Sequence, residues 1–458
     1  MAVSDKSIQR LETFFEWGIV YSLCAVIFAL PFSIALLDSF AALAIVFYIA
    51  KKISHMTHHW PASGLGLKER LCFIWKGFCP PENFLNRPLQ FLSLAVFISV
   101  VFSQYPALSF LAFIGKFLKV IFLYFCLIEV INDHKRLESF LTFMLLSSYL
   151  VVLSGIAQHF SGYDFLRGHA LSGGRANASF FSANGLAAYL LPVIALVAHF
   201  LFKAVCRRSW LTVLGWAFFL GMVLACLCWT YSRASWLGFL VIVLVMCMLD
   251  RRKTLLGAIL LLVFIFIFLP ALNDVRHLYL INDNSLRSTA HHQPVVHPSP
   301  SKANGFSAKA VSEMDFLLEQ GGSGRRHFWD KAVSFIRLSP VHGTGLNTYG
   351  RMLKKDPDKT TWWYAHNSYL QMTAETGFLG LISFLWLIFV LLARALNACK
   401  QDIFLQAMIS GLSGYLVQSF FDNTFFVVQL TVLLWLVIGL VVAGTRLPKE
   451  STGTSWVK

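Results

Sequence analysis

Runs of apolar residues long enough to cross a lipid bilayer recur along most of this 458-residue chain. A transmembrane helix needs about 20 such residues, and somewhat fewer when interfacial side chains reach toward water. Twelve runs qualify, at about 14–30, 32–50, 89–104, 109–131, 139–160, 184–202, 211–230, 235–249, 254–272, 368–392, 403–421 and 424–444. Hydrophobic residues make up 57% of the chain and charged residues 13%, unlike a soluble globular protein. The sequence therefore predicts an all-α polytopic membrane protein with about 12 transmembrane helices.

Lysine and arginine are distributed unevenly between these runs. With the N-terminus in the cytoplasm, the inner segments hold 21 of them and the short outer loops hold three, Arg167, Arg175 and Arg233. An excess of Lys and Arg marks the cytoplasmic side of a membrane protein. We therefore expect both termini in the cytoplasm. The net charge of +15 then reflects topology and anionic lipid, and it gives no support to nucleic-acid binding.

One predicted outer segment, residues 273–367, is long. Residues 1–272 hold the first nine predicted helices, 368–444 hold the last three, and 445–458 form a cytoplasmic tail.

Within the long segment, composition changes along the chain. About 283–312 is polar and rich in Pro and Ser, which predicts disorder. About 323–340 has apolar residues at helical spacing and ends at Pro340, so we expect a helix there.

Five basic residues are forced to the outer face. They are Arg175 in a Gly-rich loop, Arg233 in the hairpin Trp229-Thr-Tyr-Ser-Arg-Ala-Ser-Trp236, the pair Arg325 and Arg326, and His366 just before a predicted span. Taken singly, Arg233 could snorkel to lipid headgroups and His366 could belong to an interfacial aromatic belt. We expect Arg175 and Arg326 to be auxiliary. The convergence of these basic groups on one face favours a phosphate-binding site, because guanidinium groups pair with phosphate oxygens in a bidentate way.

Three further charges lie within predicted spans. Lys116 and Lys119 share a helix face in the run 109–131, and Glu375 lies in the run 368–392. Charges in lipid are costly unless paired, so we expect a structural ion pair for Glu375. Lys116 and Lys119 could meet a lipid phosphate or that glutamate, and the sequence leaves both open.

Metal and cofactor sites have little support. His291, His292 and His297 lie in the polar stretch, where nothing nearby completes a rigid site. Asp356-Pro-Asp358 resembles the D-x-D motif with which many glycosyltransferases hold a metal, but such a triplet in a Lys-rich loop is typical of a solvated turn. The nine cysteines include no C-x-x-C pair, and neither a Walker A nor a dinucleotide motif occurs. We expect no metal and no cofactor.

The order and spacing of several short motifs resemble the O-antigen ligase and polymerase superfamily, bacterial membrane glycosyltransferases that use polyprenyl-diphosphate-linked glycans. The motifs are Asn184-Gly-Leu-Ala, Tyr231-Ser-Arg-Ala-Ser-Trp236, Gly324-Arg-x-x-x-Trp329 followed by Pro340-x-x-Gly-x-Gly345, and His366-Asn-Ser-Tyr-Leu-Gln-x-x-x-Glu-x-Gly377.

The resemblance implies a GT-C-like fold in the bacterial inner membrane and a metal-independent, inverting glycosyl transfer from an undecaprenyl-diphosphate donor. Arg233 and Arg325 match the family arginines that grip the donor diphosphate, although Arg326 leaves the second position ambiguous. His366 matches the family histidine that handles the acceptor. The chemistry agrees, because arginines stabilise charge on a departing diphosphate and a neutral imidazole can accept a hydroxyl proton.

Among related functions, we favour an O-antigen ligase that joins a lipid-linked oligo- or polysaccharide to a lipid A-core hydroxyl. A polymerase would use the same donor chemistry. A protein O-oligosaccharyltransferase usually carries a larger exported C-terminal domain, which this sequence does not show. A transporter would place its polar groups near the membrane midplane, whereas here they gather at one face.

Overall fold

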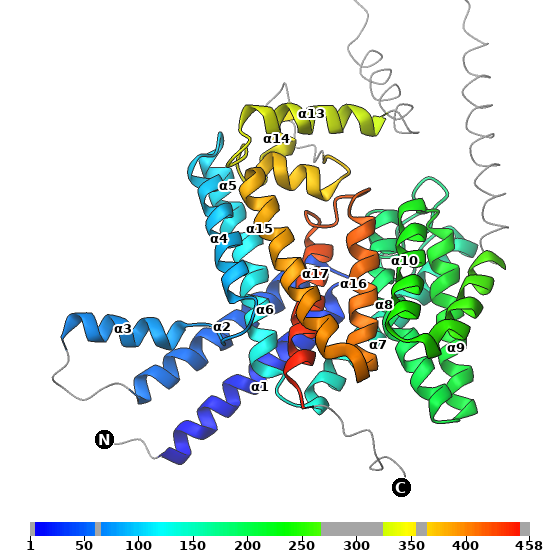
Figure 1. The fold of residues 1–458 in the computed structure, drawn as a ribbon, viewed down its shortest axis with the longest axis horizontal. Helices are drawn as coiled ribbons and strands as arrows, with labels where there is room; N and C mark the ends of the chain where they lie inside the picture. Colours follow the sequence, from blue (N-terminus) through cyan, green and yellow to red (C-terminus); the bar gives the residue numbers. More distant parts are fainter. Residues whose placement is uncertain (1–4, 60–65, 267–323, 354–363, 449–458) are drawn as a thin grey trace, which may run out of the picture.

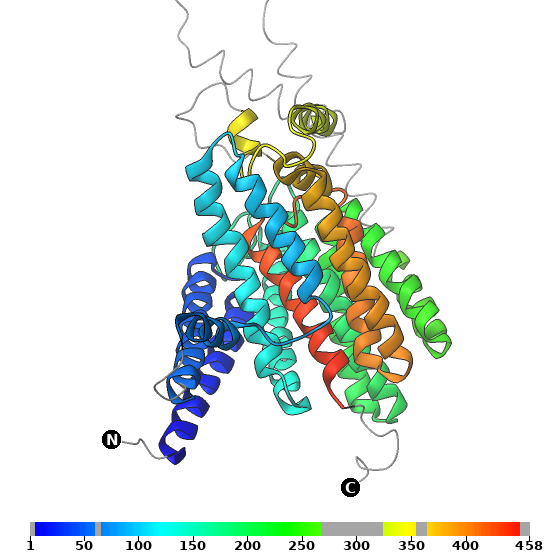
Figure 2. The ribbon, with the colours of Figure 1, turned by 60° about the vertical axis from the view of Figure 1, so that its left-hand side comes forward.

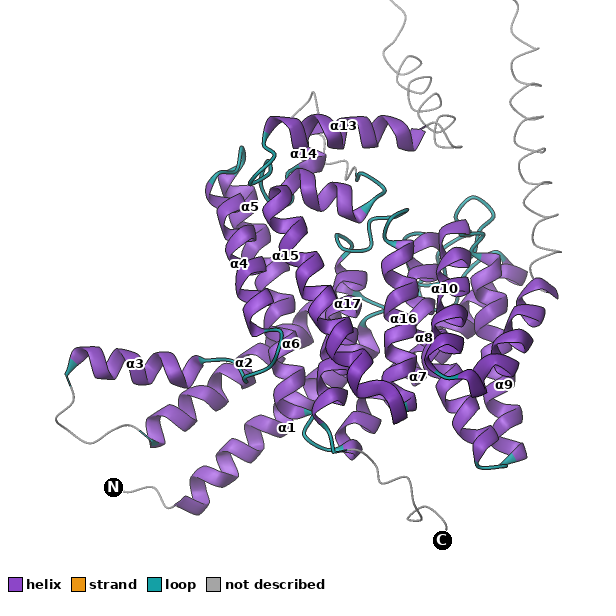
Figure 3. Ribbon diagram, in the orientation of Figure 1, coloured by secondary structure: helices purple, strands orange, loops and turns teal. Residues whose placement is uncertain are grey.

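The chain folds as a bundle of helices (Figures 1 and 3). The computed structural model describes residues 5–59, 66–266, 324–353 and 364–448. The helices are α1 (Asp5–Ala29), α2 (Ile34–His58), α3 (Leu67–Phe78), α4 (Asn86–Val101), α5 (Pro106–Ala112), α6 (Lys119–Val130), α7 (His134–Ser161), α8 (Ala183–Cys206), α9 (Trp210–Trp229), α10 (Arg233–Leu249), α13 (Gly324–Leu338), α14 (Tyr349–Leu353), α15 (Ser368–Ala398), α16 (Ile403–Gln418) and α17 (Val428–Arg446). A π-helical turn, η1 (Phe113–Leu118), joins α5 to α6, and residues 254–266 are also helical.

Some predicted features lie outside the described residues. They are the polar stretch 283–312 with its three histidines, the Asp356-Pro-Asp358 triplet, and the cytoplasmic tail beyond residue 448.

Eight helices of the described chain are long and apolar enough to cross a membrane: Gln9–Ala29, Ile34–His58, Pro106–Val130, His134–Ser161, Ala183–Cys206, Trp210–Trp229, Ser368–Ala398 and Val428–Arg446. Three shorter apolar helices accompany them: Asn86–Val101, Arg233–Leu249 and Ile403–Gln418. Each overlaps a run predicted from the sequence. The expectation of an all-helical polytopic membrane protein is therefore confirmed.

Helix α8 lies in the core of the bundle. Of its most apolar 18-residue stretch, 94% is buried inside the protein. Outer helices instead expose large apolar side chains such as Phe14, Phe91 and Leu211. Exposed apolar surface of this extent is unfavourable in water and suits contact with lipid.

A close crossing of α10 and α16 depends on two glycines. A Cβ atom on Gly238 would lie 2.8 Å from the carbonyl oxygen of Gly414, and one on Gly414 would lie 2.6 Å from that of Gly238. Small residues allow helices in membranes to approach until their backbones touch. This contact fixes α10, which begins at Arg233, against the helix that leads to the α16–α17 turn.

The two ends of the bundle differ. At one end α13 lies across the spans, and the start of α1 and the end of α17 lie at the opposite end (Figures 1 and 2). At that opposite end Lys51 pairs with Glu16 and Glu129 at 3.2 Å each, and Lys52 pairs with Glu129 at 2.8 Å. Helix α3, which no apolar run predicted, lies beside α2 at this end.

The long helix α15 is broken at Gly377, whose φ of 67° and ψ of −176° are not helical. The break exposes backbone groups of α15, and the segment Pro340–Gly345 binds them. The N–H of Phe378 donates to the Pro340 carbonyl at 2.8 Å. The N–H groups of Thr344 and Gly345 donate to the carbonyls of Ala374 and Glu375 at 2.9 and 3.0 Å. The sequence had predicted one uninterrupted run over 368–392, because hydropathy does not report the direction of the backbone.

Glycine is required on both sides of this contact. A Cβ atom on Gly377 would lie 2.0 Å from the Val341 carbonyl oxygen, and one on Gly343 would lie 2.3 Å from the backbone of Glu375. Gly377 also occupies a backbone region that other residues almost never adopt. The two motifs Pro340-x-x-Gly-x-Gly345 and Glu375-x-Gly377 therefore form one structural unit. The segment Pro340–Gly345 is called here the docked loop.

Replacing Gly377 by Ala should destabilise the protein by about 3 kcal/mol or more, through backbone strain and the clash with Val341. The measurement is the thermal unfolding temperature of the purified protein in detergent. Gly215→Ala is the matched control, since a Cβ there meets no atom within 4 Å and α9 gains helix propensity. Equal unfolding temperatures for the two variants would contradict this account of the break.

Candidate functional site

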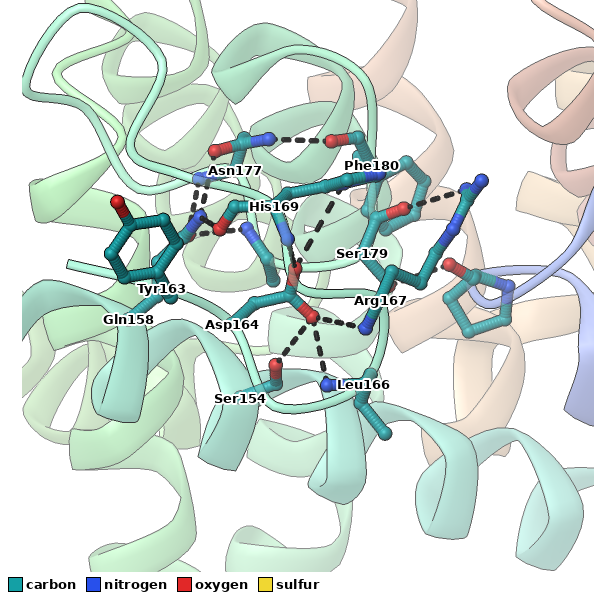
Figure 4. A network of polar contacts seen from close by, with 12 residues as sticks. Ser154, Gln158, Tyr163, Asp164, Leu166, Arg167, His169, Asn177, Ser179 and Phe180 are labelled. Carbon is teal, nitrogen blue, oxygen red and sulfur yellow. Dashed lines mark hydrogen bonds and ion pairs between the residues drawn. The ribbon is translucent and has the colours of Figure 1, made fainter. Parts of the chain in front are cut away.

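The loop between α7 and α8 is held in place by buried polar side chains (Figure 4). Gln158 of α7 accepts hydrogen bonds from the backbone N–H groups of Asn177 and Ala178, at 2.9 and 2.7 Å. Asp164 is 2% exposed and accepts from the N–H groups of Leu166 and Arg167. A buried carboxylate with several backbone donors fixes loop geometry firmly. The loop that carries Arg175 is therefore ordered.

Arg175 connects three elements. Its Nε donates to the Thr230 carbonyl at 2.7 Å, and its Nη2 donates to Asn184 Oδ1 at 2.6 Å. Thr230 follows the end of α9, and Asn184 lies in the first turn of α8. Arg175 thus holds the start of α8 against the turn that leads to Arg233.

Arg233 is the first residue of α10 and is exposed. Tyr231 turns the chain there with a left-handed φ of 49°. Within the part of the chain that the structure describes, the Arg233 side chain makes no hydrogen bond or ion pair. A guanidinium at a helix N-terminus adds its charge to the positive end of the helix dipole, which favours an anionic ligand.

His366 sits immediately before α15 in a left-handed conformation, with φ of 50°. Its Nδ1 lies 3.9 Å from Asp422 Oδ1 and 3.5 Å from Asn423 Nδ2. Both partners belong to the turn between α16 and α17. The imidazole is 35% exposed. Because Nδ1 faces this turn, Nε2 is the ring nitrogen left to meet a substrate.

Helix α13 lies over the histidine. The Phe328 ring meets the His366 ring edge-on, with centroids 5.7 Å apart. Tyr349 donates its hydroxyl to the Phe328 carbonyl at 2.6 Å. Burial raises the pKa of the Tyr349 phenol, and the nearby Glu375 carboxylate adds to the shift, so the phenol stays protonated and able to donate.

The position of Phe328 separates the two adjacent arginines. At 3.6 residues per turn, Arg325 lies within about 60° of Phe328 around the helix axis and Arg326 about 160° away. Arg325 is half-buried and Arg326 is exposed. Arg325 therefore lies on the side of α13 that faces His366.

A chain of hydrogen bonds joins Arg175 to His366. Gln418 of α16 donates to the Asn184 carbonyl at 3.2 Å. The Ser368 N–H donates to the Ser419 carbonyl at 2.9 Å, and the Ser368 hydroxyl donates to the Asp422 carbonyl at 2.7 Å. Because Asn184 binds Arg175 and Ser368 lies two residues after His366, these bonds connect Arg175 to His366 through the α16–α17 turn.

Three predicted charges form a separate cluster. Glu375 is 1% exposed and accepts from the Asn347 N–H at 2.6 Å and from Gln371 Nε2 at 3.1 Å. Lys116 donates to Asn347 Oδ1 at 2.8 Å, and Lys119 pairs with Asp38 at 2.6 Å. Glu375 thus supports the docked loop through backbone donors, and its expected ion pair stays a prediction.

Sequence reasoning missed Asp422 and Asn423. A usable signal existed for Asp422, since it lies between the runs 403–421 and 424–444, where a charge at the membrane rim is a functional candidate by the criterion applied to Arg233. Gln158 and Asp164 carry no comparable signal, because their role depends on folded-loop contacts. In the described segments, no three His, Cys, Asp or Glu side chains gather closely enough to hold a metal ion.

Fold and site together define a polytopic helical membrane protein with guanidinium groups and one imidazole at a shared end of the bundle. Residues 217–385 match the family model described as O-antigen ligase. This match, over less than half of the chain, supports the resemblance to the O-antigen ligase superfamily, a family of glycosyltransferase-like membrane enzymes that includes ligases and polymerases. A search of curated proteins found no match. The matched stretch contains Arg233, Arg325 and His366, while Arg175 and Asp422 lie outside it.

Proposed function

We propose that this protein is an O-antigen ligase, which transfers a polysaccharide from a polyprenyl diphosphate to a sugar hydroxyl of a lipid A core. The observation that carries the proposal is the placement of His366 and Asp422 beneath α13, on the side that bears Arg325. In this proposal the chain crosses the bacterial inner membrane about 12 times, with both ends in the cytoplasm and the site on the periplasmic face.

The donor is held through its diphosphate by Arg233 and Arg325. Negative charge builds on the diphosphate as its bond to the anomeric carbon breaks, and fixed guanidinium groups stabilise that charge without a metal ion. Arg175 already donates to Thr230 and Asn184, so its first role is to hold the turn before Arg233 in position.

The acceptor hydroxyl is activated by His366. Its oxygen attacks the anomeric carbon on the face opposite the diphosphate, its proton passes to Nε2, and the lipid diphosphate departs with the bonding electron pair. This displacement inverts the anomeric configuration. In the neutral base the ring proton is on Nδ1, toward the Asp422 carboxylate 3.9 Å away, and that carboxylate stabilises the imidazolium that forms.

His366→Asn should lower kcat by about 1,000-fold, because it removes the general base while asparagine tolerates the left-handed backbone. Asp422→Asn should lower kcat by about 100-fold, because the ring loses its charged partner. The donor KM should stay within about twofold in both, since neither residue holds the diphosphate in the proposal. The measurement is transfer by purified protein from a lipid-linked donor to a core acceptor. Full activity in His366→Asn would exclude the proposed base.

Arg325→Ala should reduce kcat/KM for the donor by about 100-fold, in line with the loss of one group that stabilises transition-state charge. Arg326→Ala is the matched control on the opposite side of α13 and should stay within about twofold. Initial rates over a series of donor concentrations test both variants. The reverse order of effects would show that Arg326 binds the donor.

Deleting the protein from its cell separates ligase from polymerase. A ligase null should lose all polymer from lipopolysaccharide while lipid-linked polymer accumulates. A ladder shortened to single repeats would instead identify a polymerase, which shares the donor chemistry. Gel analysis of lipopolysaccharide and of extracted lipid-linked glycan gives the answer.

A further inference from the structure

A lateral cavity of about 110 Å³ lies between α4, the η1–α6 helix, α15 and α17. Most of its wall is apolar, with Leu92, Val96, Val120, Phe384, Val432 and Trp435, and Lys119 and Thr431 also line it. Figures 1 and 2 place α4 and α6 on one side of α15 and α16, and α10 on the other. The cavity is therefore remote from the helix that begins at Arg233.

One end of the cavity is polar. Lys116, Asn347, Glu375 and Thr376 line it where the docked loop meets the break in α15. The π-helical turn η1 carries Lys116, and such turns frequently mark functional positions. Trp435 lies seven residues into α17, so at 1.5 Å per residue it is about 10 Å deeper than the outer end of that helix. The lining is thus polar where the docked loop meets it and mostly apolar elsewhere, and the charge of Lys119 is paired with Asp38, which suits an amphipathic lipid.

The cavity adjoins the proposed base. Phe425 and Phe426 line it, and the same turn supplies Asp422 and Asn423 to His366. The polar head of a lipid held here would lie toward the turn that faces the histidine. A base acts on the acceptor, whereas the donor diphosphate is assigned to the arginines, and Arg233 lies across α16. Position therefore favours the acceptor lipid as the occupant.

We infer that this cavity binds a hydrocarbon chain of the acceptor lipid, with Lys116, Asn347 and Glu375 at the boundary between chain and head. The inference rests on the proposed function and deepens it. Within a bilayer the chain gains no hydrophobic free energy by entering the protein, so packing and the polar boundary provide selectivity. The benefit to the reaction is orientation, because an anchored chain delivers its sugar hydroxyl to His366 in a restricted range of positions.

The first test fills the cavity with Val432→Trp in the full-length purified protein. Two acceptors are compared, the acylated lipid A core and the same core oligosaccharide without acyl chains. The kcat/KM for the acylated acceptor, divided by that for the acceptor without acyl chains, should fall by about tenfold because chain packing is lost. Leu94→Trp, on the lipid-facing side of α4 and outside the cavity lining, is the matched control and should preserve the ratio. An unchanged ratio in Val432→Trp, or an effect confined to donor KM, would overturn the inference.

The second test requires no turnover. An acceptor lipid with a photoreactive group in one acyl chain should label α4, α6 and α17, unlabelled acceptor should suppress the labelling, and Val432→Trp should reduce it. Labelling that a polyprenyl diphosphate suppresses equally well would assign the cavity to the donor and overturn the inference. Absence of transfer with either acceptor, together with acceptor-specific labelling, would refute the proposed ligase reaction and retain the binding site.

Discussion

The fold of the end of the bundle that carries α13 depends on the docking of the segment Pro340–Gly345 into the break of α15. A helix interrupted in a membrane leaves N–H and C=O groups without partners, and the docked loop supplies those partners with its own backbone. Three left-handed glycines, Gly343, Gly345 and Gly377, make the approach close enough. The contact sets the direction of the first part of α15 and hence the place of His366. It also brings Asn347 to Glu375 and Lys116.

This arrangement separates the tasks of the proposed reaction in space. Arg175 lies in the loop before α8, Arg233 begins α10, and Arg325 lies on α13. His366 lies between them and the lateral cavity, beside the α16–α17 turn. The cavity lies toward α4 and α6. Fixed guanidinium charge stabilises a leaving group wherever the anion forms, and an imidazole must touch the attacking hydroxyl. Two lipid substrates can then reach one centre from different sides of the bundle.

The sequence predicted the helical membrane fold well, because the cost of exposing polar backbone to lipid leaves a strong compositional record. It also placed Arg175, Arg233, Arg325 and His366 on one face by topology alone. It could not show that the Pro340–Gly345 motif binds the Glu375–Gly377 motif, since that contact is between backbone atoms about 30 residues apart and one sequence carries no trace of it. The sequence also could not separate Arg325 from Arg326. The contact of Phe328 with His366 orients α13 and shows that Arg325 is the one on the same side of the helix.

The break in α15 also bears on the length of the span. As a continuous helix its 31 residues would extend about 46 Å, well beyond a hydrocarbon layer of about 30 Å. From Phe378 onward about 21 residues remain, which matches that thickness. Only this second part has the length of a membrane span, so the carbonyls of Ala374 and Glu375 before the break take their partners from the docked loop and not from a continuous helix.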